Sequence, residues 1–289
     1  MTEKEIIKVS LCSLYLLCPE KSSKNSGKDG LIIVKVNQCK ADTSSQKKLS
    51  PDGNLSYSDT IVEIGCLFIN VPYKSGTLER LGKEKLIVNV SSFDCTTYVE
   101  TVLALARCAD AGKLSRSEFL KNLKLIRYRQ GKIDGYSSRL HYFTDWLRDN
   151  EKKKIIKDIS RHFDAEAQRK KINYMTLNRA SYPTLKNEFE FQKMSLIEKN
   201  LSRKVFYIID KDKVNQQKTK IKNGDVIAVA TKDDGLDMAH VGFAIWQEKN
   251  LHLLHASSKE GGVVISATTI VAYLKSNKKF TGITIARFS

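Results

Sequence analysis

The sequence predicts an α+β protein, with helices in the first part of the chain and an antiparallel sheet in the last part. Two observations support this class. Apolar residues recur at helical spacing in the segment 95–110. The last third instead holds short β-branched runs separated by Gly, Asp, Asn and Lys. A chain of 289 residues that is 41% hydrophobic is long enough to bury a substantial core.

The first 54 residues differ from the rest in composition. Residues 6–18 form an apolar run that resembles the core of a signal peptide, although an ordinary buried helix or strand fits the run equally well. The run is too short to span a bilayer, and no other stretch is a candidate. Residues 19–54 are rich in Lys, Ser, Asn and Gly, with one predicted strand at 31–36. We therefore expect a leader and linker at 1–54 and a globular domain at 55–289.

Helices are predicted over 57–71, 95–110 and 116–127. In the second of these, apolar residues stand at 99, 102, 103 and 106, and Gly112 follows as a stop signal. This helix is therefore expected to be buried on most of its surface. Charged residues crowd 148–171, which predicts a solvent-exposed helix there.

Five strands are predicted after these helices. They are DVIAVAT (225–231), HVGFAIW (240–246), LHLLHAS (251–257), VVIS (263–266) and ITIARF (283–288). The short stretch 248–250 between the second and third strands is typical of a hairpin turn.

The net charge of +17 would attract polyanions, and nucleic acid, anionic wall polymers and carboxylate-rich peptides all qualify. A lysine-rich overall composition is the plainer explanation, because the lysines are scattered and form no long block. No zinc-finger spacing or aromatic–basic RNA-binding signature accompanies them, so we predict no nucleic-acid partner.

The cysteines do not indicate a disulfide framework or a zinc ribbon. Six are present, at positions 12, 18, 39, 66, 95 and 108, with no CxxC pair and with wide spacings. Two histidines at 252 and 255 fall on opposite faces of a strand, which argues against a metal site. The segment 76–85 has the wrong glycine spacing for a phosphate-binding loop. We therefore predict neither a metal nor a cofactor.

Cys95 is the strongest candidate for catalysis. It follows Asp94, a plausible helix cap, and opens the most apolar helix. A thiol in the first turn faces unpaired backbone N–H groups and the positive end of the helix dipole, which favour the thiolate. A thiolate can attack a carbonyl carbon, and the same N–H groups can hold the resulting oxyanion. A buried structural cysteine at a helix start is the alternative reading.

His240 and His255 could supply the base that a cysteine nucleophile needs. If Gln247 pairs with Asn250 across a two-residue loop, Gly242 faces His255 and His240 is its diagonal neighbour on the same face. A loop one residue longer would place the two histidines on opposite faces. The sequence thus allows a Cys–His–His relay, with His240 as base and His255 orienting it. Ordinary strand histidines remain the alternative.

The segment 136–146 carries an unusual mixture of polar and aromatic residues. Leu140, Phe143 and Trp146 fit the apolar stripe of a helix. That stripe does not explain the residues between and before them, which can contact carboxylates, sugars or peptide planes. We predict a substrate-pocket wall formed by Tyr136, Ser138, Arg139, His141 and Tyr142, with Tyr73 as a further wall residue.

These residues carry a resemblance to a known family. The stretches are PYKSGTLE (72–79), FDCTTYVETVLALAR (93–107), IRYRQGKIDGYSSRLHYFTDW (126–146), GDVIAVATKDDGLDMAHVGFAI (224–245) and LHLLHASS (251–258). In this order they resemble the N-acetylmuramoyl-L-alanine amidase-like family of the NlpC-type, papain-like cell-wall cysteine amidases. The resemblance covers most of 55–289 and implies a papain-like core in which the Cys helix packs on the C-terminal sheet.

The resemblance also implies the roles of the site residues. Cys95 would be the nucleophile, His240 the base and His255 the third member, and in the wider clan a Tyr near position 73 lies beside the nucleophile. The implied activity is hydrolysis of the bond between N-acetylmuramic acid and L-alanine in bacterial peptidoglycan or muropeptides. Because the 126–146 block is large, we expect the sugar to be required. A peptidase acting within the stem peptide and a non-catalytic wall-binding module are the alternatives.

A peptidoglycan substrate would fit a protein exported to the periplasm or cell envelope. The apolar run at 6–18 is consistent with export, and a cytoplasmic location stays open. The oligomeric state cannot be read from the sequence.

Overall fold

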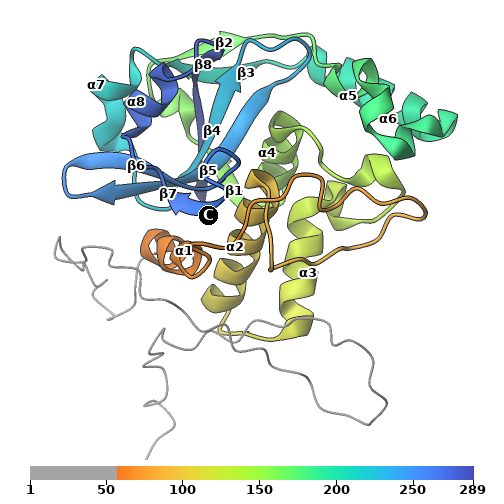
Figure 1. Cartoon of the computed structure of the whole chain (residues 1–289), viewed down its shortest axis with the longest axis horizontal. Helices are drawn as coiled ribbons and strands as arrows, with labels where there is room; N and C mark the ends of the chain where they lie inside the picture. Colours follow the sequence, from red (N-terminus) through yellow and green to blue (C-terminus); the bar gives the residue numbers. More distant parts are fainter. Residues whose placement is uncertain (1–56) are drawn as a thin grey trace, which may run out of the picture.

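An eight-stranded sheet with helices packed around it forms the described part of the chain, residues 57–289 of a computed structural model (Figure 1). The helices are α1 (Tyr57–Cys66), α2 (Cys95–Asp110), α3 (Arg116–Arg127), α4 (Phe143–Lys152), α5 (Tyr174–Leu177), α6 (Glu188–Ser202), α7 (Val214–Gln217) and α8 (Ile270–Lys275). The strands are β1 (Ile156–Asp158), β2 (Ala165–Gln168), β3 (Phe206–Asp210), β4 (Val226–Thr231), β5 (Met238–Gln247), β6 (Asn250–Ser257), β7 (Gly262–Ile265) and β8 (Phe280–Phe288).

The strands pair in the order β2-β3-β8-β4-β5-β6-β7, every pair is antiparallel, and β1 adds to β8. The predicted α+β arrangement, with helices before an antiparallel sheet, is confirmed. The predicted leader, linker and strand at 31–36 lie outside the described residues, as do the cysteines at 12, 18 and 39.

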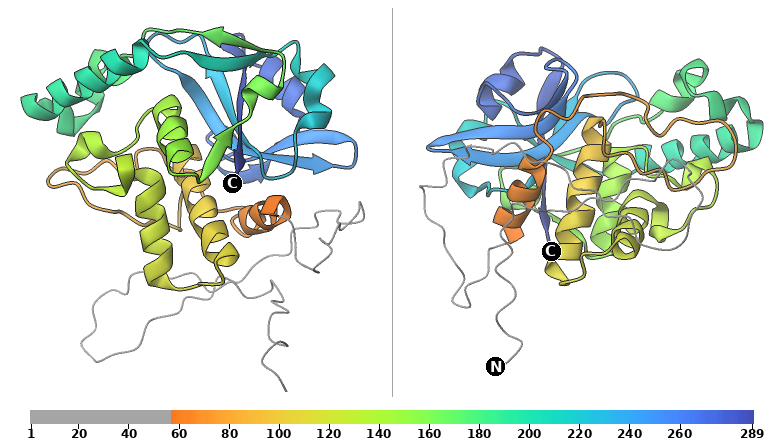
Figure 2. Two further views of the ribbon diagram at one scale, coloured as in Figure 1. Left: turned by 180° about the vertical axis from the view of Figure 1, so that it is seen from behind. Right: turned by 60° about the horizontal axis from the view of Figure 1, so that its bottom comes forward.

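β4 lies between β8 and β5 and is buried along its whole length, which explains its continuous apolar sequence. Alternate residues of this strand enter two different hydrophobic clusters. Val226 and Ala228 join the cluster that contains α1, α2 and α3, whereas Ile227 and Val229 join the one that contains α7 and α8. The sheet is therefore covered by helices on both faces, as the two views in Figure 2 show.

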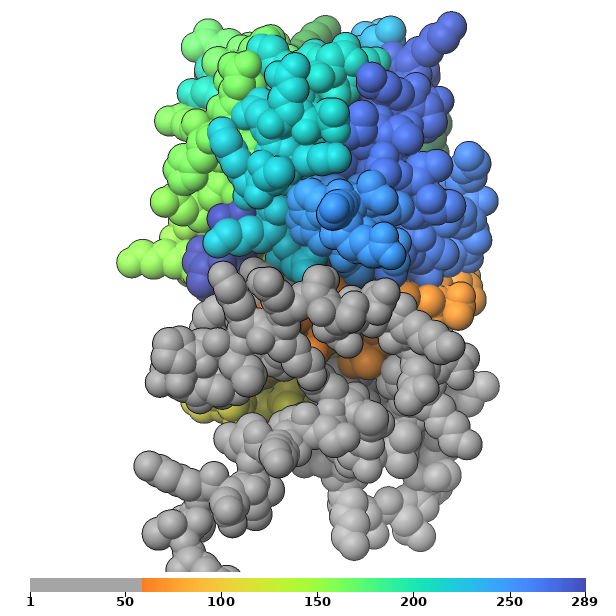
Figure 3. Space-filling view, turned by 90° about the vertical axis from the view of Figure 1, so that its left-hand side faces the viewer, coloured from red at the N-terminus to blue at the C-terminus, as the bar shows by residue number. Residues whose placement is uncertain are grey.

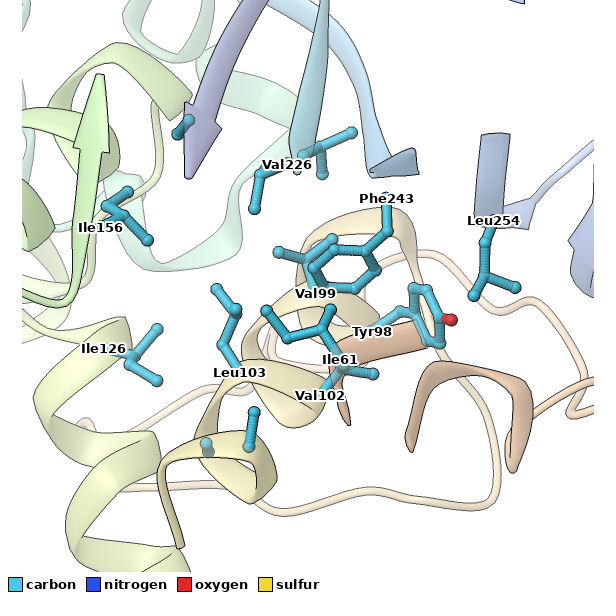
Figure 4. Close-up of a cluster of buried hydrophobic side chains, with 14 of the residues drawn as sticks. Ile61, Tyr98, Val99, Val102, Leu103, Ile126, Ile156, Val226, Phe243 and Leu254 are labelled. Atoms are coloured by element: carbon cyan, nitrogen blue, oxygen red, sulfur yellow. The ribbon is translucent and has the colours of Figure 1, made fainter. Parts of the chain in front are cut away.

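The α2 helix supplies much of the first cluster. Figure 4 shows Val99 and Leu103 of this helix facing Val226 and Phe243 of the sheet. Each of these side chains is almost completely buried, which contributes about 1.5–3 kcal/mol per residue to stability. This burial fixes the start of α2 against the sheet. Figure 3 shows the face that α5 and α6 do not reach, where residues of the C-terminal third lie above α1.

Two predicted helices differ from the observed structure. The helix expected over 57–71 ends at Cys66, and a turn with a positive φ at Asn70 follows. The exposed helix predicted over 148–171 is wrong, because α4 ends at Lys152 and the chain then forms β1 and β2. Pairing of β1 with β8 buries Ile156 there, an interaction that the local charge pattern could not reveal. The segments that form β3 and α6 were not predicted.

Candidate active site

Cys95 is the first residue of α2, and its position is set by the cap before it. The Asp94 carboxylate accepts a hydrogen bond from the Thr97 backbone N–H at 2.7 Å, and the Thr97 hydroxyl pairs with the Asp94 backbone N–H at 3.0 Å. This reciprocal capping box confirms the predicted cap and satisfies orphan donors of the first turn. The side chain of Cys95 is left partly exposed at the helix start.

The predicted pairing of His240 with His255 is confirmed. Gln247 pairs with Asn250 across a two-residue loop, and His240 Nε2 lies 2.6 Å from His255 Nδ1. The two rings are 4.8 Å apart and nearly perpendicular. Gly242 makes this approach possible, because a Cβ atom there would lie 2.8 Å from the His255 Cβ.

Cys95 lies close to the strand that carries His240. The β5–β6 ladder ends at Phe243 and Leu254, and beyond it the Val241 backbone forms a hydrogen bond with the Cys95 sulfur. Cys95 therefore lies against the residue that follows His240. Cys95, His240 and His255 are thus contributed by three different elements, α2, β5 and β6.

The protonation state of Cys95 differs from the sequence-based expectation. Burial and then the nearby Asp94 carboxylate raise the pKa of the thiol to about 11, and hydrogen bonds from Val241 and Thr96 oppose this only in part. The helix start contributes only about 0.3–1 kcal/mol in favour of the anion. The sequence predicted a lowered pKa and a resting thiolate. That prediction is wrong, because the pKa is raised and the resting sulfur is a neutral thiol.

The two histidines are neutral as well. Burial, then His255, lowers the pKa of His240 to about 3, and burial lowers the pKa of His255 to about 4. If His240 donates through Nε2 to His255 Nδ1, its own Nδ1 keeps a lone pair that can accept the thiol proton. At neutral pH the Cys95 thiol and the His240 imidazole are therefore both uncharged.

Tyr73 lies near Cys95. Its backbone forms an isolated parallel β-bridge with Phe93, two residues before Cys95. Burial, and then the charges of Cys95 and Asp94, raise the pKa of its hydroxyl. The Tyr73 hydroxyl is therefore neutral at neutral pH and lies close enough to Cys95 to be influenced by its charge.

Arg139 lies in a different environment, because its partners are groups of the chain itself. The guanidinium is 5% exposed, forms an ion pair with Glu79 at 2.7 Å and donates to the Leu78 carbonyl at 2.9 Å. The Tyr136 hydroxyl donates to the other oxygen of Glu79 at 2.8 Å. These contacts tie the loop before α2 to the segment that precedes α4.

The remaining residues of the predicted wall also have internal partners. His141 Nε2 lies 2.9 Å from the Tyr136 carbonyl, and the Ser138 hydroxyl donates to the Gly135 carbonyl. The Tyr142 hydroxyl donates to Glu198 of α6 at 2.6 Å. Among the contacts of residues 57–289, none joins these side chains to Cys95, His240 or His255. The structure thus brings Tyr73 to the relay and places the 136–142 group in a neighbouring polar network.

Comparison with known proteins identifies the family. Residues 63–283 match the AmiA-like family, described as N-acetylmuramoyl-L-alanine amidase-like.

The chain belongs to this family.

The chain is also similar to several solved structures over most of its length. An N-acetylmuramoyl-L-alanine amidase from Bacteroides uniformis is 38% identical with a TM-score of 0.77, and the match covers 81% of this chain and 99% of that chain. A Bacteroides fragilis protein described as a putative xylanase is 42% identical with a TM-score of 0.74, and the match covers 78% of this chain and 99% of that chain. A Legionella pneumophila protein is 27% identical with a TM-score of 0.61, covering 80% and 89%. Comparison with curated protein sequences found no match.

Two residues of this amidase-like protein escaped the sequence analysis. Asp237 is buried and accepts hydrogen bonds from the Thr144 N–H at 2.7 Å and the Met238 N–H at 2.8 Å, so it joins the start of α4 to the strand that carries His240. An acidic residue just before an apolar strand could have suggested this role. Tyr273 of α8 contacts both imidazole rings, and no local pattern indicated it.

Residues 57–289 were also searched for cavities, metal-binding clusters and membrane-spanning helices. A cavity of about 640 Å³ between α4 and α6 is lined by charged residues, including Arg129 and Asp145, which pair at 2.7 Å. Within 57–289, no group of three or more His, Cys, Asp or Glu side chains forms a metal-binding cluster. No helix in that range is long and apolar enough to cross a membrane.

Proposed function

We propose that this protein hydrolyses the amide bond between N-acetylmuramic acid and L-alanine in peptidoglycan fragments, with Cys95 as the nucleophile. The observation that carries this proposal is the 2.6 Å contact between His240 and His255 beside the start of the helix that bears Cys95. Membership of an amidase-like family supports the choice of bond and a peptidoglycan substrate.

Acylation begins with the Cys95 thiol and the His240 imidazole both uncharged. His240 Nδ1 accepts the Cys95 proton as the sulfur attacks the lactyl carbonyl of muramic acid. Backbone N–H groups at the start of α2 stabilise the oxyanion. The protonated His240 then gives its proton to the departing L-alanine amine, which leaves a thioester.

Deacylation reverses the proton path. A water molecule attacks the thioester carbonyl, His240 accepts the water proton, and the proton returns to the Cys95 sulfur as the lactyl carboxylic acid leaves. His255 accepts a hydrogen bond from His240 throughout, and it thereby holds the tautomer in which Nδ1 faces the thiol. A neutral histidine serves here where a carboxylate serves in other relays.

The decisive experiment is mass spectrometry of defined muropeptides after incubation with the wild type and with Cys95→Ala. We expect the wild type to release intact stem peptide with a free L-alanine amine, and the variant to release none. Cys66→Ala is a matched control, because Cys66 is a buried cysteine outside the relay. Turnover by Cys95→Ala would refute the cysteine mechanism.

Cleavage within the stem peptide is the second candidate, and one observation favours it. Nη1 and Nη2 of Arg139 and the hydroxyl of Tyr136, on which the expected sugar requirement depended, are engaged with the Leu78 carbonyl and Glu79. The same incubation with sugar-free stem peptides separates the two candidates. Hydrolysis of the peptide at a rate equal to that of the muropeptide would favour the peptidase.

We also propose export to the periplasm or cell envelope, supported by the apolar run at 6–18. Fractionation of cells that express the full chain, with sequencing of the mature N-terminus, tests this. Recovery of the intact chain only in the cytoplasm would contradict export.

A further inference from the structure

The α8 helix is held firmly over one face of the sheet, close to the histidines. Ile270 and Leu274 are buried in the second hydrophobic cluster, and the Thr269 side chain caps the helix at the Ala272 N–H. The ring of Tyr273, between these anchors, stacks on Phe280 at 5.8 Å. Its position is therefore fixed from both sides.

The Tyr273 ring meets both imidazoles of the relay. Its centroid lies 5.6 Å from the His255 ring in an edge-to-face arrangement and 6.2 Å from the His240 ring. The two imidazoles are themselves perpendicular and share the 2.6 Å contact. Three rings thus form one cluster, in which Tyr273 is the only member with no role in the proton path.

The hydroxyl of Tyr273 is influenced by the nucleophile. Burial, then the charge of Cys95 and then that of Glu260, raise its pKa to about 12, so the hydroxyl stays neutral during turnover. Tyr273 therefore borders the relay without competing for its protons.

We propose that Tyr273 is a positioning residue of the thiol–imidazole relay, whose ring holds His255 perpendicular to His240 so that His240 keeps its base tautomer and orientation. This proposal rests on the proposed function.

The physical need for such a residue follows from the partners of His255. The His255 Nε2 atom is buried and has no hydrogen-bond partner among the described residues. A single hydrogen bond to His240 leaves the His255 ring free to rotate about that bond, so packing must fix the ring plane. An edge-to-face aromatic contact supplies that restraint, because the positive edge of one ring favours the negative face of the other.

The test measures how Tyr273 and His255 depend on each other. The rate at which iodoacetamide alkylates Cys95, followed by mass spectrometry of the Cys95 peptide, reports proton transfer from the thiol to His240 and needs no substrate. It is measured in the wild type, Tyr273→Leu, His255→Asn and the double variant. We expect Tyr273→Leu to slow alkylation about fivefold, and to have no further effect when His255 is already Asn.

Turnover gives an independent readout. Tyr273→Leu should lower kcat on a muropeptide about tenfold with little change in KM, and Tyr273→Phe should restore it to within about threefold, because the ring and not the hydroxyl acts. Tyr207→Leu is the matched control, since Tyr207 lies on β3 and contacts Arg161. Tyr273→Met replaces Tyr273→Leu if the latter does not fold.

Three results would overturn the proposal. The first is a Tyr273→Leu variant in which Cys95 is alkylated at the wild-type rate. The second is a Tyr273→Leu substitution that slows alkylation as much in the His255→Asn variant as in the wild type. The third is a Tyr273→Phe variant that does not restore kcat. Failure of the proposed function would look different. Cys95→Ala would then still turn over muropeptides, while the alkylation cycle would continue to report the coupling between Tyr273 and His255.

Discussion

Gly242→Ala tests whether the close approach of β5 and β6 sets the geometry of the relay. An added Cβ would lie 2.8 Å from the His255 Cβ, 2.9 Å from the Leu254 carbonyl oxygen and 3.0 Å from the Leu253 Cγ. Two of these atoms are fixed to the β6 backbone and cannot rotate away. The strand must therefore shift by several tenths of an ångström, which moves His255 away from His240.

The expected cost has two parts. Overpacking of this kind typically costs about 1–3 kcal/mol, which should appear as a lower midpoint of urea unfolding. Displacement of His255 lengthens the 2.6 Å contact with His240. Since misplacement by 1 Å can cost about a hundredfold in rate, we expect kcat to fall by about 10- to 100-fold, measured on a muropeptide at a temperature where the variant is folded.

A control separates the two effects. Ala244→Gly on the same strand should lower stability by about 0.5–1 kcal/mol through backbone entropy, while leaving the Gly242–His255 contact intact and kcat unchanged. A Gly242→Ala variant with wild-type stability and wild-type kcat would refute the argument that backbone approach positions His255.

Three further predictions concern charge and burial. Arg139→Met should lower the free energy of unfolding by about 1–3 kcal/mol, seen in urea denaturation, because Glu79 loses its cation and keeps only the hydrogen bond from Tyr136; a loss below 0.5 kcal/mol would show that the ion pair does not stabilise the fold. In a His240→Ala variant, which lacks the base that accepts the thiol proton, the rate of Cys95 alkylation should rise about tenfold per pH unit from pH 6 to pH 10, because the thiol pKa is about 11; a plateau near neutral pH would indicate a resting thiolate. The free energy of unfolding should fall as pH drops from about 6.5 toward 4, because His255 binds a proton in the unfolded state but, with its pKa of about 4, not in the folded state. The slope for this one group is at most about 1.4 kcal/mol per pH unit. His255→Asn should flatten this pH profile.

The sequence determined those parts of the protein that depend on local pattern. The spacing of apolar residues in 95–110 marked α2, and Asp94 marked its cap, since both depend on neighbours within a few residues. For the hairpin after Gln247 the sequence allowed a two-residue loop, and the observed pairing of Gln247 with Asn250 places His240 and His255 on one face.

Only the tertiary structure decided properties that depend on what packs against a residue. The pKa of Cys95 is set by burial and by Asp94, and these outweigh the helix start that the sequence displays. Arg139 pairs with Glu79, 60 residues away in the chain, so its engagement could not be read from the 136–146 block. Tyr273 reaches the imidazoles because α8 docks on the sheet, and pairing of β1 with β8 replaces the helix that local charge suggested. Desolvation, ion pairing and strand addition are long-range effects, and no window of sequence contains both partners.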